Sequence, residues 1–234
     1  MQIRRDFAIH LSQDTFVQMH GARLASLLDT PSRRAILLEV LEEAQASLSP
    51  AAAWDRFAVT EIRHDRLILV GGRSLGGGPV ARVMYGAEEL VVAVCTAGAE
   101  IDARVAEYQR RRELFRAMLL DELGSWAVDQ VRQMLCRSLE DEFDVQGWRT
   151  STPLSPGESA WSVAEQRILF DLLDAARIGV TLSEGAMMRP TKSLSFIMGV
   201  GRRPLGAEGR SGCEFCSMKE RCLYREQREK SIQS

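Results

Sequence analysis

A run of five apolar residues at positions 90–94, Leu-Val-Val-Ala-Val, most constrains what this chain can fold into. A continuous apolar run of this length is typical of a central strand that is buried on both faces. A Thr-Ala-Gly turn at residues 96–98 follows, with Glu100 in the first turn of a helix. Helical pattern then continues to about Phe143, with a polar interruption at residues 109–112. The sequence therefore predicts a buried strand followed by an unusually long helical segment.

The other segments indicate helices interleaved with few strands. Further helices are expected at residues 16–28, from Thr30 with proline in the first helical position, and at 163–176 behind a capping box of Ser162 and Glu165. Strands are expected at residues 57–62 and 67–70, which form a hairpin, and at 179–182 and 193–200. Linkers or loops are expected at residues 49–53, 71–79 and 147–160. This order favours an α+β fold with a modest antiparallel sheet.

The composition limits the classes of function. The chain has 234 residues and a formal net charge of −2, so it lacks the dense basic charge that nucleic-acid binding favours. No apolar run approaches the roughly 18 residues needed to span a bilayer, and residues 1–14 are too polar for a secretory signal. We therefore expect a cytoplasmic protein that binds neither nucleic acid nor membrane.

Three regions are expected along the chain. Residues 1–50 form an N-terminal helical segment, and residues 51–204 form the α+β core. Residues 205–234 form a short tail with too few hydrophobic residues for a core of its own.

The tail contains a cluster of three cysteines. Cys213 and Cys216 have the C-x-x-C spacing of half a metal-binding knuckle. Cys222 follows after the five intervening residues 217–221. Nearby Lys219, Arg221 and Arg225 favour the thiolate form that binds metal. Soft thiolates select an iron–sulfur cluster or zinc over magnesium or calcium, so Cys213, Cys216 and Cys222 are predicted ligands of one of these centres.

The identity of a fourth ligand stays open. No histidine lies near the cluster, which leaves Cys95, Cys136, a second chain or an exogenous molecule. Cys95 and Cys136 stand in apolar surroundings, where the commoner role of a cysteine is that of a small buried hydrophobe. The alternative for the tail itself is a redox-active or unpaired C-x-x-C.

A carboxylate interrupts one side of the long helix. The residues that share this side are Leu114, Met118, Asp121, Ser125, Val128 and Arg132. An unpaired buried carboxylate is costly. Asp121 is therefore expected either to face a pocket or to have a donor partner.

Several separated segments resemble one known family in the right order. They are Ser-Pro-Gly at 155–157, Trp161, Glu-Gln-Arg at 165–167, residues 178–184, Met187, Met188, Pro190, residues 192–195 and, upstream, residues 96–101 and 120–128. Over about residues 80–202 the chain resembles the reactivation (S-adenosylmethionine-binding) domain of cobalamin-dependent methionine synthase, and in particular its short stand-alone relatives found near corrinoid proteins.

The resemblance implies a fold and a site. The fold is an α+β domain with a twisted antiparallel sheet and long flanking helices, which docks over a corrinoid and holds S-adenosylmethionine. Asp121 matches the family's acidic residue on the long helix, and a carboxylate suits the cationic end of that ligand. The resemblance places the ligand against the loop of Ser155, Gly157 and Glu158, with Glu184 nearby.

The ligand loop departs from the family pattern. The family reads Arg-x-x-Pro-Gly-Tyr, whereas this chain has Pro153 in place of the arginine and Glu158 in place of the tyrosine. The ligand carboxylate thus lacks its usual partner, which argues against S-adenosylmethionine binding in the family's manner, and Arg149 is the substitute that the sequence offers. The chain also has no Asp-x-His-x-x-Gly motif, so we expect cobalamin to be presented by a partner.

Three functions follow, in this order of preference. The first is an accessory protein of corrinoid-dependent methyl transfer, which docks on the cobalamin of a corrinoid-binding protein or methyltransferase and supports its reductive reactivation through the C-terminal centre. The second is a non-enzymatic adaptor with a zinc-stapled tail. The third is an S-adenosylmethionine-binding methyltransferase component. The sequence leaves open whether the chain is itself an enzyme.

Overall fold

The computed structural model describes residues 1–158 and 160–206. The predicted metal ligands Cys213, Cys216 and Cys222 lie outside these residues.

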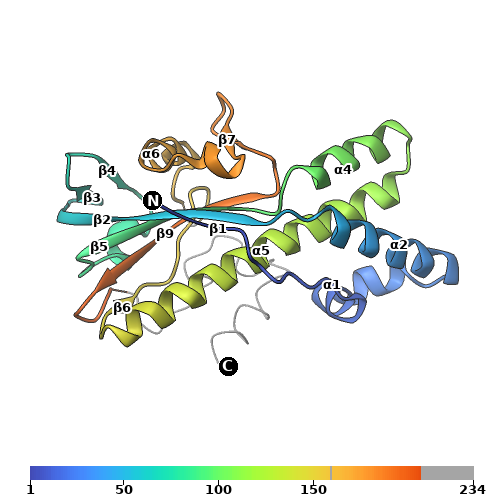
Figure 1. Ribbon diagram of the computed structural model, residues 1–234, viewed down its shortest axis with the longest axis horizontal. Coiled ribbons are helices and arrows are strands. Elements are labelled where there is room, and N and C mark those ends of the chain that lie inside the picture. The colour runs from blue at the N-terminus through green and yellow to red at the C-terminus, as the bar shows by residue number, and fades with distance from the viewer. Residues whose placement is uncertain (159, 207–234) are drawn as a thin grey trace.

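The centre of the fold is an antiparallel sheet whose strands run in the order β4-β3-β2-β5-β9-β6, with β1 paired to β2 (Figure 1). Its strands are β1 (Gln2–Arg4), β2 (Ala51–Arg63), β3 (Arg66–Leu69), β4 (Ser74–Gly76), β5 (Glu89–Thr96), β6 (Arg149–Thr150) and β9 (Ser193–Gly201). The strands β7 (Thr181–Leu182) and β8 (Met188–Arg189) form a separate hairpin. Strand β5 pairs along its whole length with β2 on one side and β9 on the other, which confirms the central strand predicted at residues 90–94.

Helices cover both faces of the sheet. They are α1 (Gln13–Leu27), α2 (Pro31–Ser47), α3 (Val80–Val83), α4 (Glu100–Arg110), α5 (Leu114–Val145) and α6 (Gln166–Leu172), with 3₁₀ turns η1 (Val163–Glu165) and η2 (Ala175–Ile178). The long helix α5 crosses one face, whereas α6 and the β7–β8 hairpin lie on the other (Figure 1).

The alternation of side chains along β5 builds a core on each face, as the period of two in a strand requires. Val91, Ala93 and Cys95 are buried in the core shared with α1, α2, α4 and α5. Val92 and Val94 are buried in the core shared with α6, η2 and β3. Because both faces are covered, a continuous apolar run is the sequence this strand needs.

The predicted α+β class, with an antiparallel sheet and long helices, is confirmed. The polar interruption at residues 109–112 divides α4 from α5, and the Thr30 side chain caps α2 by accepting a hydrogen bond from the Arg33 N–H. The division of the chain at residue 50 stays a prediction, although β1 pairs with β2 across it.

Several local predictions are wrong. Strands β4 and β6 lie within the segments expected to be loops at residues 71–79 and 147–160. The alanines at 51–53, expected to be linker, open strand β2, where β1 and β5 pair with opposite edges and every side chain is buried. The helix expected at residues 163–176 begins as η1, continues as α6 and ends at Leu172, because Leu173 has extended backbone angles and a second 3₁₀ turn follows.

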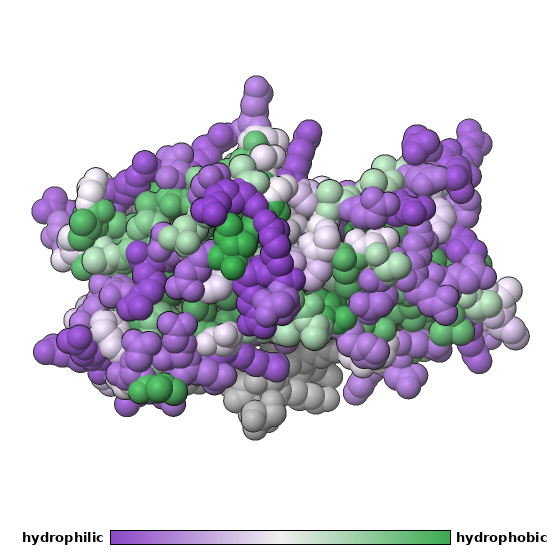
Figure 2. Space-filling view, viewed as in Figure 1, coloured by the Kyte–Doolittle hydropathy of each residue, from purple (hydrophilic) through white to green (hydrophobic). Residues whose placement is uncertain are grey.

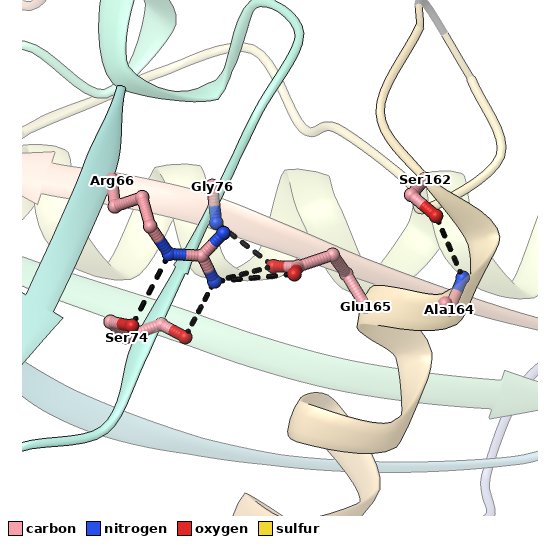
Figure 3. A network of polar contacts seen from close by, with 6 residues as sticks. All are labelled: Arg66, Ser74, Gly76, Ser162, Ala164 and Glu165. Atoms are coloured by element: carbon pink, nitrogen blue, oxygen red, sulfur yellow. Dashed lines mark hydrogen bonds and ion pairs between the residues drawn. The ribbon is translucent and has the colours of Figure 1, made fainter. Parts of the chain in front are cut away.

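Half of the expected capping box forms. Ser162 accepts a hydrogen bond from the Ala164 N–H, but the Glu165 carboxylate points away from it (Figure 3). Glu165 instead accepts from the Arg66 guanidinium, 3.1 Å away, and from the Gly76 N–H, 3.0 Å away. This carboxylate therefore fastens α6 to the β3–β4 hairpin, a partner that local spacing cannot reveal.

Within the described residues, the structure contains no helix of the length and apolarity required to cross a membrane. The face seen in Figure 2 is largely hydrophilic, with hydrophobic side chains in small patches between polar ones.

Candidate functional site

An ion pair occupies the position at which the sequence predicts a pocket or a donor. Asp121 lies in the second turn of α5, and its Oδ1 is 2.7 Å from the Nζ of Lys192. The lysine side chain is only 9% exposed, whereas that of Asp121 is 50% exposed. Lys192 Nζ also donates to Ser125 Oγ at 3.1 Å. A nearly buried ammonium thus has a carboxylate partner that reaches solvent.

The backbone of Lys192 is held at the end of the sheet. Its carbonyl accepts hydrogen bonds from the Ala97 N–H at 2.9 Å and from the Thr96 hydroxyl at 3.3 Å. Strand β9 begins at the next residue, so the end of β5 sets the position from which the lysine side chain crosses to α5.

A glycine in α5 makes room for that side chain. A Cβ on Gly124 would lie 2.7 Å from Cγ2 of Ile101 in α4 and 3.0 Å from Cγ of Lys192. Glycine inside a helix costs about 1 kcal/mol relative to alanine. Here it lets α4 and the lysine stem approach the α5 backbone, which explains its presence.

The Pro-Gly loop closes on itself beside β9. Leu154 bridges to Ile197, and Gly157 has a φ of +94°, a region that favours glycine. The Gly157 N–H donates to the Trp161 carbonyl at 2.8 Å, and the Glu158 N–H donates to the Ser155 carbonyl at 3.0 Å. The N–H groups of Gly157 and Glu158, two of the three residues against which the resemblance places the ligand, therefore have acceptors inside the loop.

The loop also buries an indole. The Trp161 side chain is 2% exposed, and its Nε1 has no hydrogen-bond partner among the described residues. Because the atom is fully enclosed, it opens onto no surface from which a ligand could approach.

Glu158 lies near a second charged group on α5. Burial lowers the pKa of Arg132, but Asp129, which accepts two of its hydrogen bonds, raises it together with Cys136 and Glu158, and the net shift is upward. Arg132 follows Asp121 by eleven residues, or about 16 Å along the helix. Asp121 and Arg132 thus lie on the same side of α5, three turns apart, whereas Leu154 and Trp161 of the loop are buried in the core on the other face of the sheet.

The structure does not bring Glu184 to Asp121. Glu184 is exposed in the turn between β7 and β8, where its carbonyl accepts a hydrogen bond from Arg167 of α6. This hairpin lies on the α6 side of the sheet, opposite α5 (Figure 1). Arg149 is also remote, since it follows the C-terminal end of α5 in strand β6.

Cys95 in β5 and Cys136 in α5 are both buried. Burial raises the pKa of the Cys95 thiol, and Cys136 adds to this while Arg132 opposes it. No group of three or more potential metal ligands occurs within residues 1–158 and 160–206. The three tail cysteines lie beyond that part, so the predicted metal centre stays a prediction.

Two surface hollows of the described part lie away from Asp121. The larger, about 590 Å³, is at the end of α5 and is lined by Glu140, Asp141, Asp144, Gly147, Trp148, Arg149 and Thr150. The smaller, about 520 Å³, lies between α6 and β7. Neither contains Asp121, Glu184 or a residue of the Pro-Gly loop, although the larger contains Arg149, the substitute cation that the sequence offers.

The arrangement of sheet and helices defines the fold class to which the chain is similar. A solved structure described as the MetH reactivation domain bound to AdoHcy matches it with a TM-score of 0.52. The match covers 80% of this chain and 75% of that chain at 13% sequence identity. No protein-family model matches the chain, and no curated protein does. The likeness is therefore one of fold, and it confirms the α+β architecture that the sequence resemblance implied.

Sequence reasoning named Asp121 but missed its partner. Lys192 was noted only as part of the segment 192–195 that resembles the family, although it is the sole lysine in residues 1–206. A lone lysine in an arginine-rich chain is a signal that a compact ammonium is needed at that position, since arginine and lysine are not interchangeable.

Proposed function

We propose that this chain is an accessory protein of corrinoid-dependent methyl transfer, which docks on a partner's cobalamin and supports its reductive reactivation. The observation that carries the proposal is the fold, shared over 80% of the chain with a solved reactivation domain. The order of the sequence segments that resemble that family supports it independently. The partner is a corrinoid-binding protein or a methyltransferase.

The proposal assigns the C-terminal cysteines to a metal centre. Cys213, Cys216 and Cys222 supply three thiolates, the donor set that suits an iron–sulfur cluster or zinc. An iron–sulfur centre there would supply the electron that reduces oxidised cobalt.

Anaerobic reconstitution of the full chain tests this assignment. We expect bound iron and acid-labile sulfide with charge-transfer absorbance, lost in Cys213→Ser and retained in the control Ser217→Ala, which changes the same tail without removing a sulfur. Zinc without iron or sulfide would favour the zinc-stapled adaptor instead. Absence of any metal would contradict the centre.

Docking is tested separately with the cobalamin-binding domain of methionine synthase, loaded with cob(II)alamin. We expect a saturable change in the cobalamin spectrum as the full chain is added. An unchanged spectrum at the highest attainable concentration would count against docking on that class of corrinoid protein.

A second candidate, an S-adenosylmethionine-binding component, is favoured by two observations. The structural neighbour is bound to AdoHcy, and the Asp121–Lys192 pair places two opposite charges at a solvent-reaching position. Calorimetry with S-adenosylmethionine tests this candidate, and no heat at millimolar ligand would exclude it.

A further inference from the structure

The turn between α4 and α5 projects beyond the end of the sheet and is rich in arginine (Figure 1). Residues 109–116 contain four arginines and one glutamate. Arg111 and Arg116 form ion pairs with nearby glutamates. Arg110 and Arg112 are exposed, and their side chains form no hydrogen bond or ion pair with another described residue. The turn therefore carries two positive charges that the described part of the chain leaves uncompensated.

Arg112 occupies a backbone position that favours glycine. Its N–H donates to the Gln109 carbonyl at 3.1 Å. The next N–H, that of Glu113, donates to the Tyr108 carbonyl at 2.9 Å. These two bonds end α4 in a Schellman motif, in which the residue at the position of Arg112 is left-handed and usually glycine. The φ of Arg112 is +61°, a conformation that costs energy for a residue with a Cβ.

The described contacts do not explain why an arginine stands there. The helix dipole favours cations in the last turn of a helix, which accounts for Arg110. Arg112 lies beyond that turn, and its side chain has no partner in residues 1–158 and 160–206. A residue that breaks a local rule without compensation in the fold is expected at a functional surface.

An exposed leucine adjoins the two arginines. Leu114 is the first residue of α5, and it is 66% exposed. Guanidinium groups form bidentate hydrogen bonds with carboxylates, and arginine is enriched together with apolar contacts in protein interfaces. Two guanidinium groups are too few for nucleic acid or an anionic lipid surface, which favour denser basic clusters. The composition of the turn therefore favours a protein partner.

We propose that Arg110, Arg112 and Leu114 form a docking surface for a protein that presents carboxylates around an exposed apolar side chain. The two guanidinium groups donate to carboxylates of the partner, and Leu114 packs against its apolar side chain. This inference is independent of the corrinoid role proposed above.

Fluorescence anisotropy on the full chain tests the inference. The probe is a fluorescein-labelled peptide of repeated Glu-Glu-Leu, and a Gln-Gln-Leu peptide of equal length is its neutral counterpart. The variants are Arg110→Gln, Arg112→Gly and Leu114→Gln. Arg63→Gln is the matched control, because it removes an exposed arginine from the β2–β3 hairpin. The melting temperature of each variant is measured alongside.

The expected result is that the wild-type chain binds the acidic peptide at low salt, more weakly as salt is added, and does not bind the neutral peptide. Arg110→Gln and Arg112→Gly each lower the affinity by about three- to tenfold. Leu114→Gln lowers it by about two- to fivefold. Arg112→Gly also raises the melting temperature by about 2–4 °C, because glycine relieves the left-handed position. Arg63→Gln changes the affinity by less than about twofold.

Three results would overturn the inference. The first is no binding of the acidic peptide at millimolar concentration, or equal losses in Arg63→Gln and Arg112→Gly. The second is a fall in melting temperature in Arg112→Gly, which would assign the arginine to the fold. The third is tighter binding to vesicles of phosphatidylcholine and phosphatidylserine than to the peptide, which would point to a membrane surface instead. The docking titration with the cobalamin-binding domain decides the corrinoid role separately.

Discussion

Asp121 and Lys192 are unequally exposed. We therefore expect removal of the one charge to lower the free energy of unfolding by a different amount from removal of the other. Asp121→Asn leaves an ammonium on a side chain that is 91% buried, without a counter-charge. Lys192→Met leaves a carboxylate that is half exposed and can be hydrated where it stands.

The magnitudes follow from these exposures. Removing one partner of a fully buried pair costs about 3–5 kcal/mol. Because water reaches the pair through Asp121, we expect the free energy of unfolding of Asp121→Asn to fall by about 2–3 kcal/mol. For Lys192→Met the loss of a half-exposed ion pair, about 1 kcal/mol, is partly offset by added apolar burial. We therefore expect the free energy of unfolding of Lys192→Met to fall by less than about 1 kcal/mol.

Urea unfolding of the full chain, followed by tryptophan fluorescence, measures both values, with equal slopes required for the comparison. Equal losses for the two variants, or a larger loss for Lys192→Met, would refute the argument, since either result requires that the lysine be hydrated in the folded protein.

Three further predictions concern stability. Glu165→Ala lowers the free energy of unfolding by about 2–3 kcal/mol, because it leaves the Gly76 N–H without its acceptor and the half-buried Arg66 guanidinium without its counter-charge. The control Asp171→Ala, which breaks an exposed ion pair, changes it by less than about 0.5 kcal/mol; similar losses in urea unfolding would contradict this. Gly124→Ala destabilises the protein by about 1–3 kcal/mol despite alanine's higher helix propensity, because the new Cβ clashes; a rise in melting temperature would be the opposing result. The hydrogen bond that the His20 ring donates to the Glu122 carboxylate raises the pKa of His20 against the effect of burial. The resulting stabilisation is therefore present below the unfolded value of about 6.5 and is lost as pH rises through the higher folded value. Unfolding at pH 6 and pH 8.5 should show this decline, smaller than about 1 kcal/mol, in the wild-type chain and its absence in Glu122→Gln.

The elements with strong local signals could be predicted from the sequence. The apolar run at residues 90–94 identified β5, and Thr30 with its following proline located the start of α2. The alanines at 51–53 could not be recognised as a strand, because alanine has little preference for strands and their pairing depends on β1 and β5, which lie elsewhere in the sequence.

The candidate site shows the same limit. The position of Asp121 on a mostly apolar helix side predicted that it faces a pocket or has a donor partner, and it has a partner. The identity of that partner could not be read locally, since Lys192 is 67 residues from Ser125 and reaches α5 only because the sheet ends there. Glu165 is a parallel case, because its spacing to Ser162 predicted a local role that a partner 99 residues away takes over.

The rate of cobalt reduction tests the central claim most directly. Cob(II)alamin in the cobalamin-binding domain of methionine synthase would be mixed anaerobically with titanium(III) citrate as the reductant, with or without the reconstituted full chain. The account predicts faster formation of cob(I)alamin with the wild-type chain, a rate that saturates with its concentration, and no acceleration by Cys213→Ser. The same rate in all three mixtures would contradict the account.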